Sequence, residues 1–460
     1  MKITLPEKVR KIIHTLKSHG YEAYAVGGCV RDSILGREPE DWDITTSALP
    51  EETKALFERT FDTGIEHGTI TVLMGKEGFE VTTYRIDGKY EDNRHPKQVT
   101  FTRCLREDLL RRDFTINAMA YNEEEGIVDI FGGMEDLKQG VIRCVGNAKE
   151  RFGEDALRIL RAVRFSAQLG FSIEEETKAG IVALAPTLQQ ISAERIQVEL
   201  VKMLVSPNPE RIRLAYELGI TKVILPEFDE MMSTEQETPH HMYTVGEHTI
   251  KALTLIRADK ILRLTMLLHD VGKPMMKTID EDGVAHFKYH DVEGEKIVKR
   301  ILKRLKFDND TLRKVTKLVK HHDYRMPART KNVRHAVNVI GEDLFPFYLE
   351  VRMADTLAQS EYQRTEKLAN LDGIKDCFEE IQEKGQCVSL KTLSVTGDDL
   401  IQLGMKPGKE IGEMLNKLLQ LVLDNPEYNN EELLKLYVKE RKNLTCTIDF
   451  VLLYNTSSYS

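Results

Sequence analysis

The spacing of hydrophobic residues changes near residue 145 and divides the sequence into two kinds of structure. Before that point, short runs of β-branched and apolar residues alternate with helical patterns; the strand-like runs are residues 69–74, 79–85, 127–130 and 141–145. Glycines at both ends of residues 75–78 predict a turn that joins the first two runs into a hairpin. The N-terminal part is therefore predicted to be an α+β domain.

From about Asn147 onward, apolar residues recur at three- and four-residue spacing, which predicts a helical structure almost throughout. The segment PEFDEMMSTEQETP, residues 226–239, interrupts this pattern and is interpreted as a linker. Histidines are concentrated in the block after it. The predicted domains are a mixed head at 1–146, a helical neck at 147–226, a histidine-rich helical domain at 240–363 and a helical C-terminal tail at 364–460.

The composition narrows the class of protein. The chain has 460 residues, 41% of them hydrophobic, so it is long enough to bury several cores. No apolar run approaches the length that a transmembrane helix needs, so no membrane span is expected. Six cysteines without CxxC pairing are typical of a reducing compartment and predict a cytoplasmic protein. Because the net charge is −9, local basic patches must bind any nucleic acid.

A candidate phosphate and metal site follows the first predicted strand. That strand leads into the turn Gly27-Gly28 and a helix start, and Asp41 and Asp43 come shortly before a β-branched segment. Alternate residues of a strand share a face, so the two carboxylates could hold Mg²⁺ together. The backbone amides of the two glycines and the cation of Arg31 suit a triphosphate. The alternative is a tight turn beside a surface pair of carboxylates.

Two further segments offer polar side chains to such a site. Glu80 is an isolated acid in the second strand-like run and is a candidate third carboxylate; the alternative is an exposed edge residue. In LRRDFTINAMA, Arg112, Asp113 and Asn117 are expected at the mouth of an apolar helix, where they suit contacts with a ribose and phosphates. The alternative is a capped helix with a surface ion pair. The charged stretch 87–108 before this motif is interpreted as a mobile loop.

The segment EDALRILRAVRF, residues 154–165, is predicted to form a single helix. It carries a candidate pair for base selection, although the residues alone favour the interpretation as a salt bridge. Asp155 and Arg158 lie three residues apart and would share one face of that helix. Cytosine and adenine both present an amino donor beside a ring-nitrogen acceptor, which an aspartate and an arginine match together. Uracil and guanine reverse this pattern and would be rejected. The alternative is an ordinary salt bridge within the helix.

The order and distances of five segments resemble the motifs of the class II tRNA nucleotidyltransferases, the CCA-adding enzymes. The segments are VGGCVRD, DWD, LRRDFTINAMA, EDALRILRAVRF and, at residues 192–196, SAERI. The resemblance covers nearly the whole chain. It implies a polymerase-β-like nucleotidyltransferase head followed by an all-α neck, body and tail, with Mg²⁺ at the head.

The resemblance also implies a role for individual residues. Asp41 and Asp43 would be the metal ligands, and Glu80 would be the third catalytic carboxylate. The nucleotide-binding residues would be Gly27, Gly28, Arg31, Arg112, Asp113, Asn117, Asp155, Arg158, Arg161 and Arg164. Of these, Asp155 and Arg158 would serve as an amino-acid template for C and A. Glu194 and Arg195 would brace the neck.

The histidine-rich block resembles a second family, the HD-type phosphohydrolases, through an H…HD…D pattern; some CCA-adding enzymes carry such a domain. The implied metal ligands are His248, His269, Asp270, His290, His321, His322 and Asp355. Imidazole and carboxylate together favour a divalent transition metal, which can activate water for phosphoester hydrolysis. The alternative for any single histidine is a structural place in the core.

The sequence thus predicts addition of C, C and A to the 3′ end of tRNA from CTP and ATP by two-metal nucleotidyl transfer, with release of pyrophosphate. No protein partner is evident. Alternatives within this chemistry are an enzyme that adds only A, one that adds only CC, and a poly(A) polymerase. The charged stretch 87–108 argues against CC alone, and no basic segment typical of poly(A) polymerases follows the neck. A phosphohydrolase acting on RNA 2′,3′-cyclic phosphate or other phosphoesters is the alternative of another class, and a non-catalytic tRNA-binding protein is a third.

Two regions are candidates for contacts with tRNA. Residues 296–320 form a dense basic run, for which a solvated helix face is the favoured alternative. Residues 396–404 and 407–412 resemble the C-terminal tRNA-contacting helices of the family, and Gly404 is predicted to end the first of them.

Overall fold

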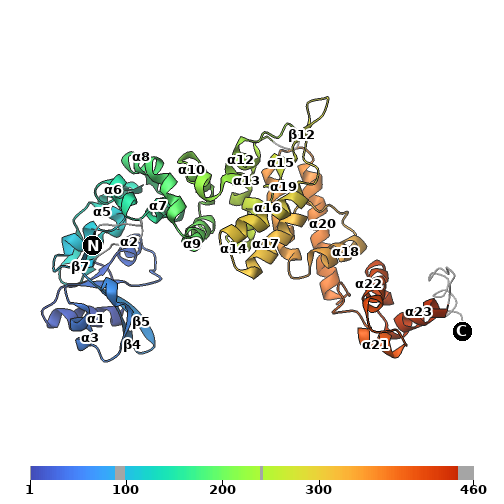
Figure 1. Ribbon diagram of the computed structural model, residues 1–460, viewed down its shortest axis with the longest axis horizontal. Coiled ribbons are helices and arrows are strands. Elements are labelled where there is room, and N and C mark those ends of the chain that lie inside the picture. Colours follow the sequence, from blue (N-terminus) through green and yellow to red (C-terminus); the bar gives the residue numbers. More distant parts are fainter. Residues whose placement is uncertain (1, 89–98, 239–241, 444–460) are drawn as a thin grey trace. The chain divides into compact units, whose positions relative to one another are not determined.

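The computed structural model describes residues 2–88, 99–238 and 242–443 (Figure 1). The chain divides into two compact units. The first consists of residues 1–234, 257–264 and 300–309, and the second of residues 235–256, 265–299 and 310–460. The cut near residue 234 falls inside the predicted linker. The predicted boundaries between head and neck and between body and tail lie within single units and stay predictions.

The first unit begins with a mixed sheet of seven strands, which confirms the predicted α+β head (Figure 1). The order across the sheet is β3-β4-β5-β2-β1-β8-β9. Only β2 and β5 run parallel; the other neighbours in this sheet are antiparallel. The strands are β1 (Ala23–Val26), β2 (Ile44–Thr46), β3 (Thr60–Gly64), β4 (Thr69–Met74), β5 (Glu77–Thr83), β8 (Met119–Asn122) and β9 (Gly126–Asp129).

The predicted hairpin is confirmed, because β4 and β5 pair antiparallel with Met74 opposite Glu77. Gly75 adopts a φ of +72°, a left-handed conformation that glycine reaches without steric cost. The strand expected at 141–145 is shorter than predicted. It consists only of β10 (Val141–Ile142), which pairs in parallel with β11 (Ser172–Ile173).

Short helices flank the sheet: α1 (Glu7–Ser18), α2 (Gly28–Ile34), α3 (Pro50–Leu56), α4 (Leu105–Leu110) and α5 (Gly133–Gln139), with 3₁₀ turns η1 (Ile65–His67) and η2 (Thr115–Asn117). Helix α1 buries Val9, Ile12, Ile13 and Leu16. These residues follow the i, i+3, i+4, i+7 spacing of one helix face, and α1 contacts β1.

The charged stretch expected to be a loop is partly ordered at its ends. Strands β6 (Arg85–Asp87) and β7 (Val99–Phe101) form an antiparallel ribbon, and α4 includes the last residues of the stretch. Residues 89–98, which are part of the predicted loop, lie outside the described residues.

The rest of the first unit is mostly helical, as predicted. Its elements are α6 (Ala148–Glu154), α7 (Leu157–Leu169), α8 (Glu175–Leu184), η3 (Ala185–Gln190), α9 (Ala193–Leu204), η4 (Pro209–Arg211), α10 (Ile212–Glu217), α11 (Thr221–Ile224) and α12 (Pro226–Ser233). Helix α12 corrects the interpretation of residues 226–239 as a linker. Pro226 occupies the first helical position, where its missing N–H costs nothing, and Phe228 and Met231 are buried.

Helices also make up most of the remaining chain: α13 (Val245–Leu255), α14 (Lys260–Leu268), α15 (Lys273–Met276), α16 (His290–Arg304), α17 (Asn309–His321), α18 (Thr330–Ile340), α19 (Phe345–Ala358), α20 (Arg364–Glu383), α21 (Gly397–Gln402), α22 (Lys409–Asp424), η5 (Pro426–Tyr428) and α23 (Glu431–Asn443). Strands β12 (Thr278–Ile279) and β13 (Ala285–His286) form a small ribbon. The last helices enclose a core of their own that contains Leu400, Leu418 and Leu434. Gly404, with a φ of +80°, follows α21 as predicted.

The basic run 296–320 belongs to α16 and α17, and many of its cations are paired. Lys299 and Lys320 both contact Glu295, at 2.7 and 2.8 Å, and Lys314 contacts Asp310 at 2.6 Å. These pairs fit the interpretation of the basic run as a solvated helix face.

No helix of the described residues has both the length and the apolar character needed to cross a bilayer.

Candidate active site and candidate metal centre

Three carboxylates meet at the parallel pair of strands in the head. Asp41 and Asp43 were expected within a strand, but they lie in the segment directly before β2. Ile44 pairs with Val81 of β5, so the preceding residues, Asp43 and Glu80, are neighbours on adjacent chains. Parallel pairing over 35 residues of sequence therefore brings Glu80 to the aspartate pair.

The pKa values of Asp43 and Glu80 are raised above their ordinary values. Loss of contact with water is the main cause at Asp43 and at Glu80, and the negative charge of Asp41 adds to it at both. Arg112 acts in the opposite direction on the pKa of Asp43. A divalent cation among these oxygens would relieve their repulsion, so the residues fit the Mg²⁺ that the sequence predicts.

The glycine turn brings the backbone close to the same place. Gly27 has a φ of +83°, and a Cβ added there would lie 3.0 Å from Nη1 of Arg112. The Nε of Arg112 is buried and has no hydrogen-bond partner within the described part of the chain. Arg112 therefore lies between the glycine turn and Asp43, with donor capacity for an anion.

Arg31 is held by protein partners in this structure. Its Nη1 donates to Oδ1 of Asn117 at 2.7 Å, and its Nε and Nη2 donate to Asp32 at 2.9 and 2.8 Å. Its guanidinium also lies 5.1 Å from the centre of the Phe165 ring. The predicted contact of Arg31 with a triphosphate stays a prediction.

Asp113 is buried at the junction of head and neck. It accepts from Nε of Arg161 at 2.7 Å, from Nδ2 of Asn117 at 3.2 Å and from the Phe114 amide at 2.8 Å. Burial alone would raise its pKa, but Arg161 and the hydrogen bonds outweigh it and lower the pKa to about 2. The apolar helix expected after this motif is wrong, because η2 leads directly into strand β8.

Asp155 and Arg158 do not share a helix face as predicted. Helix α6 ends at Glu154, Asp155 is extended, and α7 begins at Leu157. The carboxylate of Asp155 accepts instead from the Leu157 amide at 3.0 Å and from Arg195 of α9 at 2.7 Å. The first contact is a local one that interrupts the helix at Asp155, and the second depends on the packing of α9.

Arg158 lies near Asp155 but has different partners. It donates to Glu154 at 2.6 Å and to the carbonyl oxygens of Arg151 and Arg111 at 3.1 and 2.9 Å. Arg195 was expected only to brace the neck, and the structure adds that it orients the carboxylate of Asp155.

Phe165 and Glu199 are parts of this region that the sequence did not single out. The guanidiniums of Arg164, Arg31 and Arg161 lie 3.8, 5.1 and 5.3 Å from the Phe165 ring centre. Arg164 is buried and forms an ion pair with Glu199 of α9. Its predicted contact with a nucleotide therefore stays untested. Glu199 could have been found, because it is a charge within the apolar stripe of α9.

The second unit gathers six of the seven predicted HD-type ligands. They come from separate helices or helix ends: His248 on α13, His269 and Asp270 after α14, His290 at the start of α16, His322 after α17 and Asp355 on α19. The adjacent pair His269-Asp270 directly follows α14, which ends at Leu268.

These residues form two groups that share Asp270. His248, His269 and Asp270 make the first group, and Asp270, His290 and His322 make the second. In the first, Nε2 of His248 lies 3.3 Å from Nε2 of His269 and 2.9 Å from Oδ1 of Asp355. In the second group, Nε2 of His290 and Nε2 of His322 are 3.2 Å apart. They lie 3.6 and 3.5 Å, respectively, from Oδ1 of Asp270.

Backbone carbonyls orient three of these imidazoles. Nδ1 of His269, His290 and His322 lies 2.8, 2.8 and 2.7 Å from a main-chain oxygen. Nδ1 must donate in such a contact, so each neutral ring presents the Nε2 lone pair to the cluster. Two lone pairs facing each other at 3.2 Å repel unless a cation lies between them. The donor set therefore fits divalent transition metals at both groups.

His321 is a correction: it lies in neither group and, unlike Asp355, it has no hydrogen bond or ion pair with a cluster residue among the described residues. Its ring packs edge-on against Tyr324, with centroids 6.2 Å apart. Burial and the neighbouring cations Lys320 and Lys317 lower its pKa. His321 is the last residue of α17, whereas His322 follows the helix; there its Nδ1 lies 2.7 Å from the Val319 carbonyl oxygen and its Nε2 lies 3.2 Å from Nε2 of His290.

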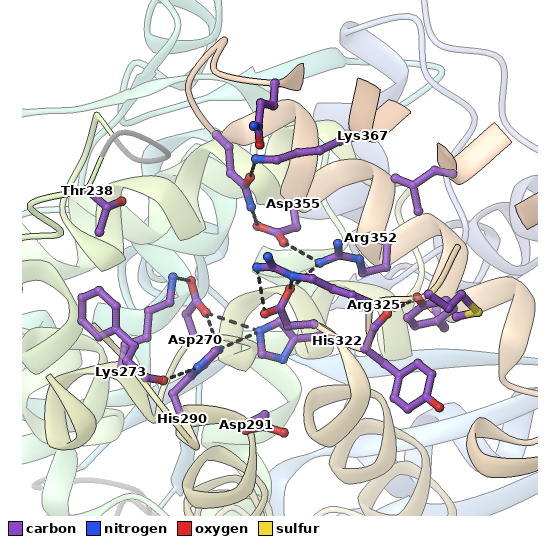
Figure 2. Close-up of a pocket in the computed structure, with 18 of the residues that line it drawn as sticks. Thr238, Asp270, Lys273, His290, Asp291, His322, Arg325, Arg352, Asp355 and Lys367 are labelled. Carbon is purple, nitrogen blue, oxygen red and sulfur yellow. Dashed lines mark hydrogen bonds and ion pairs between the residues drawn. The ribbon is translucent and has the colours of Figure 1, made fainter. Parts of the chain in front are cut away.

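The cluster opens into a cavity of about 790 Å³ (Figure 2). Asp270, His290 and His322 lie together at one part of it, and Arg325, Arg352 and Asp355 lie close by (Figure 2). The ammonium of Lys273 contacts Asp270 at 2.8 Å. Lys273 and the imidazoles hold the pKa of Asp270 well below its ordinary value despite its burial.

Comparison with known proteins shows similarity along nearly the whole chain. Family models match residues 23–143 (poly A polymerase head domain), 170–232 (probable RNA and SrmB-binding site of polymerase A) and 284–438 (tRNA nucleotidyltransferase domain 2). The CCA-adding enzyme of Enterococcus faecalis is 34% identical over 96% of this chain and 98% of its own length. The chain belongs to the CCA-adding enzymes. It is thus a tRNA nucleotidyltransferase, as the five motifs predicted.

Other members of the family agree. The CCA-adding enzyme of Leuconostoc mesenteroides is 35% identical over 96% of this chain and 99% of its own length. A Bacillus stearothermophilus CCA-adding enzyme, solved in complex with CTP, superposes with a TM-score of 0.70 at 29% identity over 96% of this chain and 98% of that one. A Thermotoga maritima CCA-adding enzyme complexed with tRNA shares the fold, with a TM-score of 0.58 at 22% identity.

Proposed function

We propose that this chain adds C, C and A to the 3′ end of tRNA, using CTP and ATP and releasing pyrophosphate. The observation that carries the proposal is the set of carboxylates Asp41, Asp43 and Glu80 beside the Gly27 turn and Arg112. Relatives at similar length are named CCA-adding enzymes, and solved relatives hold CTP, ATP or tRNA.

Different residues of the chain bind the triphosphate and the metal in this reaction. Gly27 lets the backbone approach the triphosphate, and the Nε and Nη1 of Arg112 donate to it. Asp41, Asp43 and Glu80 are the proposed ligands of Mg²⁺. When bound, Mg²⁺ would favour deprotonation of the attacking hydroxyl and neutralise charge on the leaving pyrophosphate.

Asp155 and Arg158 are the proposed base-selecting pair. Asp155 accepts from the exocyclic amino group of C or A, and Arg158 donates to the adjacent ring nitrogen. Their present contacts support this role, because Arg195 and Glu154 fix the two side chains before a base arrives. Side chains that are already fixed select a base better than side chains that must become ordered when the base binds.

A nucleotide-feeding assay tests the proposal. Transfer RNA that ends at the discriminator base is given CTP alone, ATP alone or both, and the products are sized at single-nucleotide resolution. Two C residues with CTP alone and CCA with both are expected. Addition of A only to tRNA already ending in CC would make this an A-adding enzyme. Long A tails would make it a poly(A) polymerase, and arrest at CC with both nucleotides would make it a CC-adding enzyme.

The second unit supports a second candidate function, hydrolysis of phosphoesters. The observation in its favour is the convergence of Nε2 atoms and carboxylates into two groups that share Asp270. A divalent transition metal held there would polarise the phosphoryl oxygens and activate water. His269, His290 and His322 are oriented for that role by their backbone hydrogen bonds.

Hydrolysis of adenosine 2′,3′-cyclic phosphate in the presence of Mn²⁺, Co²⁺ or Ni²⁺ tests this candidate. The double change His269→Ala with Asp270→Ala should abolish hydrolysis and leave tRNA extension intact. His335→Ala is the matched control, because its ring contacts Asp424 and is no part of the cluster. Equal hydrolysis by the double variant would refute the candidate, and loss of extension would show that the two sites depend on each other.

Contacts with tRNA are proposed for α21, α22 and the exposed basic residues of α16 and α17. Thr396 caps α21 by accepting from the Asp399 amide, which defines the start of the first tail helix.

A cytoplasmic location is proposed from cysteine usage; the five cysteines within the described residues are free thiols.

A further inference from the structure

The cavity beside the histidine cluster is much larger than a phosphate group requires. It encloses about 790 Å³ and extends from Asp270 and His290 to residues of α20, including Lys367 and Ile374. A phosphate needs only the metal centre and a few donors. The remaining space is typical of a site that also holds the organic part of its ligand.

Tyr289 stands at this cavity in a strained conformation. It lines the cavity, precedes the ligand His290 and adopts a φ of +64°, although 72% of its surface is exposed. A bulky residue rarely takes such a φ, whereas glycine takes it without cost. Because the Tyr289 ring is mostly exposed, hydrophobic burial cannot be what offsets the backbone strain at this residue. Such outliers concentrate at ligand-binding sites.

A second strained residue lines the same cavity. Within the described chain, Tyr289, Lys306 and Gln363 are the non-glycine residues with positive φ, and two of these three line it. Gln363, with a φ of +52°, brings an amide side chain that can both donate and accept a hydrogen bond. An exposed aromatic ring and an amide at one cavity suit the face and the edge of a nucleobase.

The cavity places cations beside the metal-binding cluster. The charged residues of its lining are the cations Lys273, Lys288, Arg325, Arg352 and Lys367 and the acids Asp270, Asp291, Asp323, Asp355 and Glu366. A divalent metal ion in the cluster would therefore make the net charge of the lining positive. Figure 2 places Arg325 and Arg352 close to Asp355 and His322. Cations beside a metal centre attract anionic ligands and orient them.

We propose that Tyr289 is the base-binding residue of this cavity, with its ring stacked on the base of the nucleoside phosphate that the site hydrolyses. This inference rests on the proposed phosphohydrolase function. In the reaction, water adds to phosphorus, the P–O bond to the ribose breaks, and a proton passes to the ribose oxygen, so that a nucleoside and inorganic phosphate are released. Tyr289 is a substrate-binding residue, and a base-free phosphoester gains nothing from it.

The test compares AMP with ribose 5-phosphate, which differ by the base alone. In the Mn²⁺-loaded protein, Tyr289→Leu should raise KM for AMP on the order of tenfold, the typical contribution of one base–aromatic stack. KM for ribose 5-phosphate should stay within about twofold. Tyr289→Trp should preserve the preference for AMP. Tyr362→Leu is the matched control, because Tyr362 is 48% exposed and does not line the cavity.

Tyr289→Gly is the second variant, and it separates loss of the ring from loss of the fold. Glycine relieves the strain at φ +64°, so the melting temperature should be kept or raised while KM for AMP rises as in Tyr289→Leu. The metal content of each variant, measured by mass spectrometry, should equal that of the parent. A fall in melting temperature with unchanged KM would mean that Tyr289 is structural, and would overturn the inference.

Equilibrium dialysis of labelled AMP against metal-free protein gives a readout apart from hydrolysis. The Kd should rise on the order of tenfold in Tyr289→Leu and Tyr289→Gly and stay unchanged in Tyr362→Leu. If no metal supports hydrolysis, the phosphohydrolase function fails and dialysis alone decides the role of Tyr289. An unchanged Kd, or equal effects on AMP and ribose 5-phosphate, would overturn the inference.

Discussion

The two candidate metal centres of this chain are built in opposite ways. Asp41, Asp43 and Glu80 remain accessible to solvent although Asp43 and Glu80 are partly desolvated; they offer only oxygen and lie at one pair of strands. The cluster around Asp270 is buried, mixes nitrogen with oxygen and draws on several helices. Burial and like charges raise the pKa of Asp43 and Glu80, whereas imidazoles and cations hold the pKa of Asp270 and Asp355 low.

This difference teaches how each centre relates to its substrate. An open site of a few carboxylates leaves coordination positions for phosphate oxygens, which suits Mg²⁺ that arrives with a nucleotide. A closed site of oriented imidazoles supplies most ligands itself and suits a resident transition metal. The two centres should therefore be separable by mutation, by metal and by pH.

The largest expected effect is at the open site. Asp41→Asn with Asp43→Asn should slow tRNA extension at least about a thousandfold, because both charges that hold Mg²⁺ are lost. Single-turnover extension of tRNA measures this. Asp62→Asn, an exposed acid of β3, is the control and should extend normally. Full activity of the double variant would mean that Asp41 and Asp43 do not hold the catalytic Mg²⁺.

The next largest effect is at the closed site. Asp270→Asn should weaken metal at both groups by more than about a hundredfold, because this carboxylate is shared. Elemental analysis after dialysis measures metal content, and extension should stay within about twofold. His322→Ala should affect only the second group. A parallel loss of extension and of metal would mean that the centres are coupled.

A smaller effect concerns the buried carboxylate of the head. The lowered pKa of Asp113 means that its stabilisation is complete above its ordinary pKa and is lost as the pH falls toward about 2. Asp113→Asn should cost about 2 kcal/mol at pH 7, or roughly 5 °C in Tm. The gap between variant and parent should narrow below about pH 4, as thermal melts across pH would reveal. A gap independent of pH would refute the ionic origin.

The smallest effect is expected at His321. Because this ring faces Tyr324 and not the cluster, His321→Ala should change metal affinity by less than about twofold and unfolding free energy by less than about 0.5 kcal/mol. Titration with Co²⁺ and thermal melts measure both. Loss of metal equal to that in His322→Ala would mean that His321 is a ligand after all.

Local sequence patterns predicted the local elements well. The β4–β5 hairpin and the end of α21 before Gly404 depend on residues close together in the chain. The predictions at residues 226–239, at the helix after Asp113 and at Asp155 were wrong. In each case packing decided the conformation: burial of Phe228, the strand β8, and the contact of Arg195 with Asp155.

The sequence by itself determined the chemistry available to this protein: the ordered motifs of a CCA-adding enzyme and the histidines and aspartates of a second centre. Only the tertiary structure decided which residues meet. Parallel pairing of β2 with β5 brings Glu80 to Asp43. The backbone contact of His322 after the end of α17 turns its ring toward the cluster, whereas His321 packs on Tyr324. Spacing along a chain describes neighbours within one element, whereas a binding site joins side chains from elements that meet only through burial of a common core.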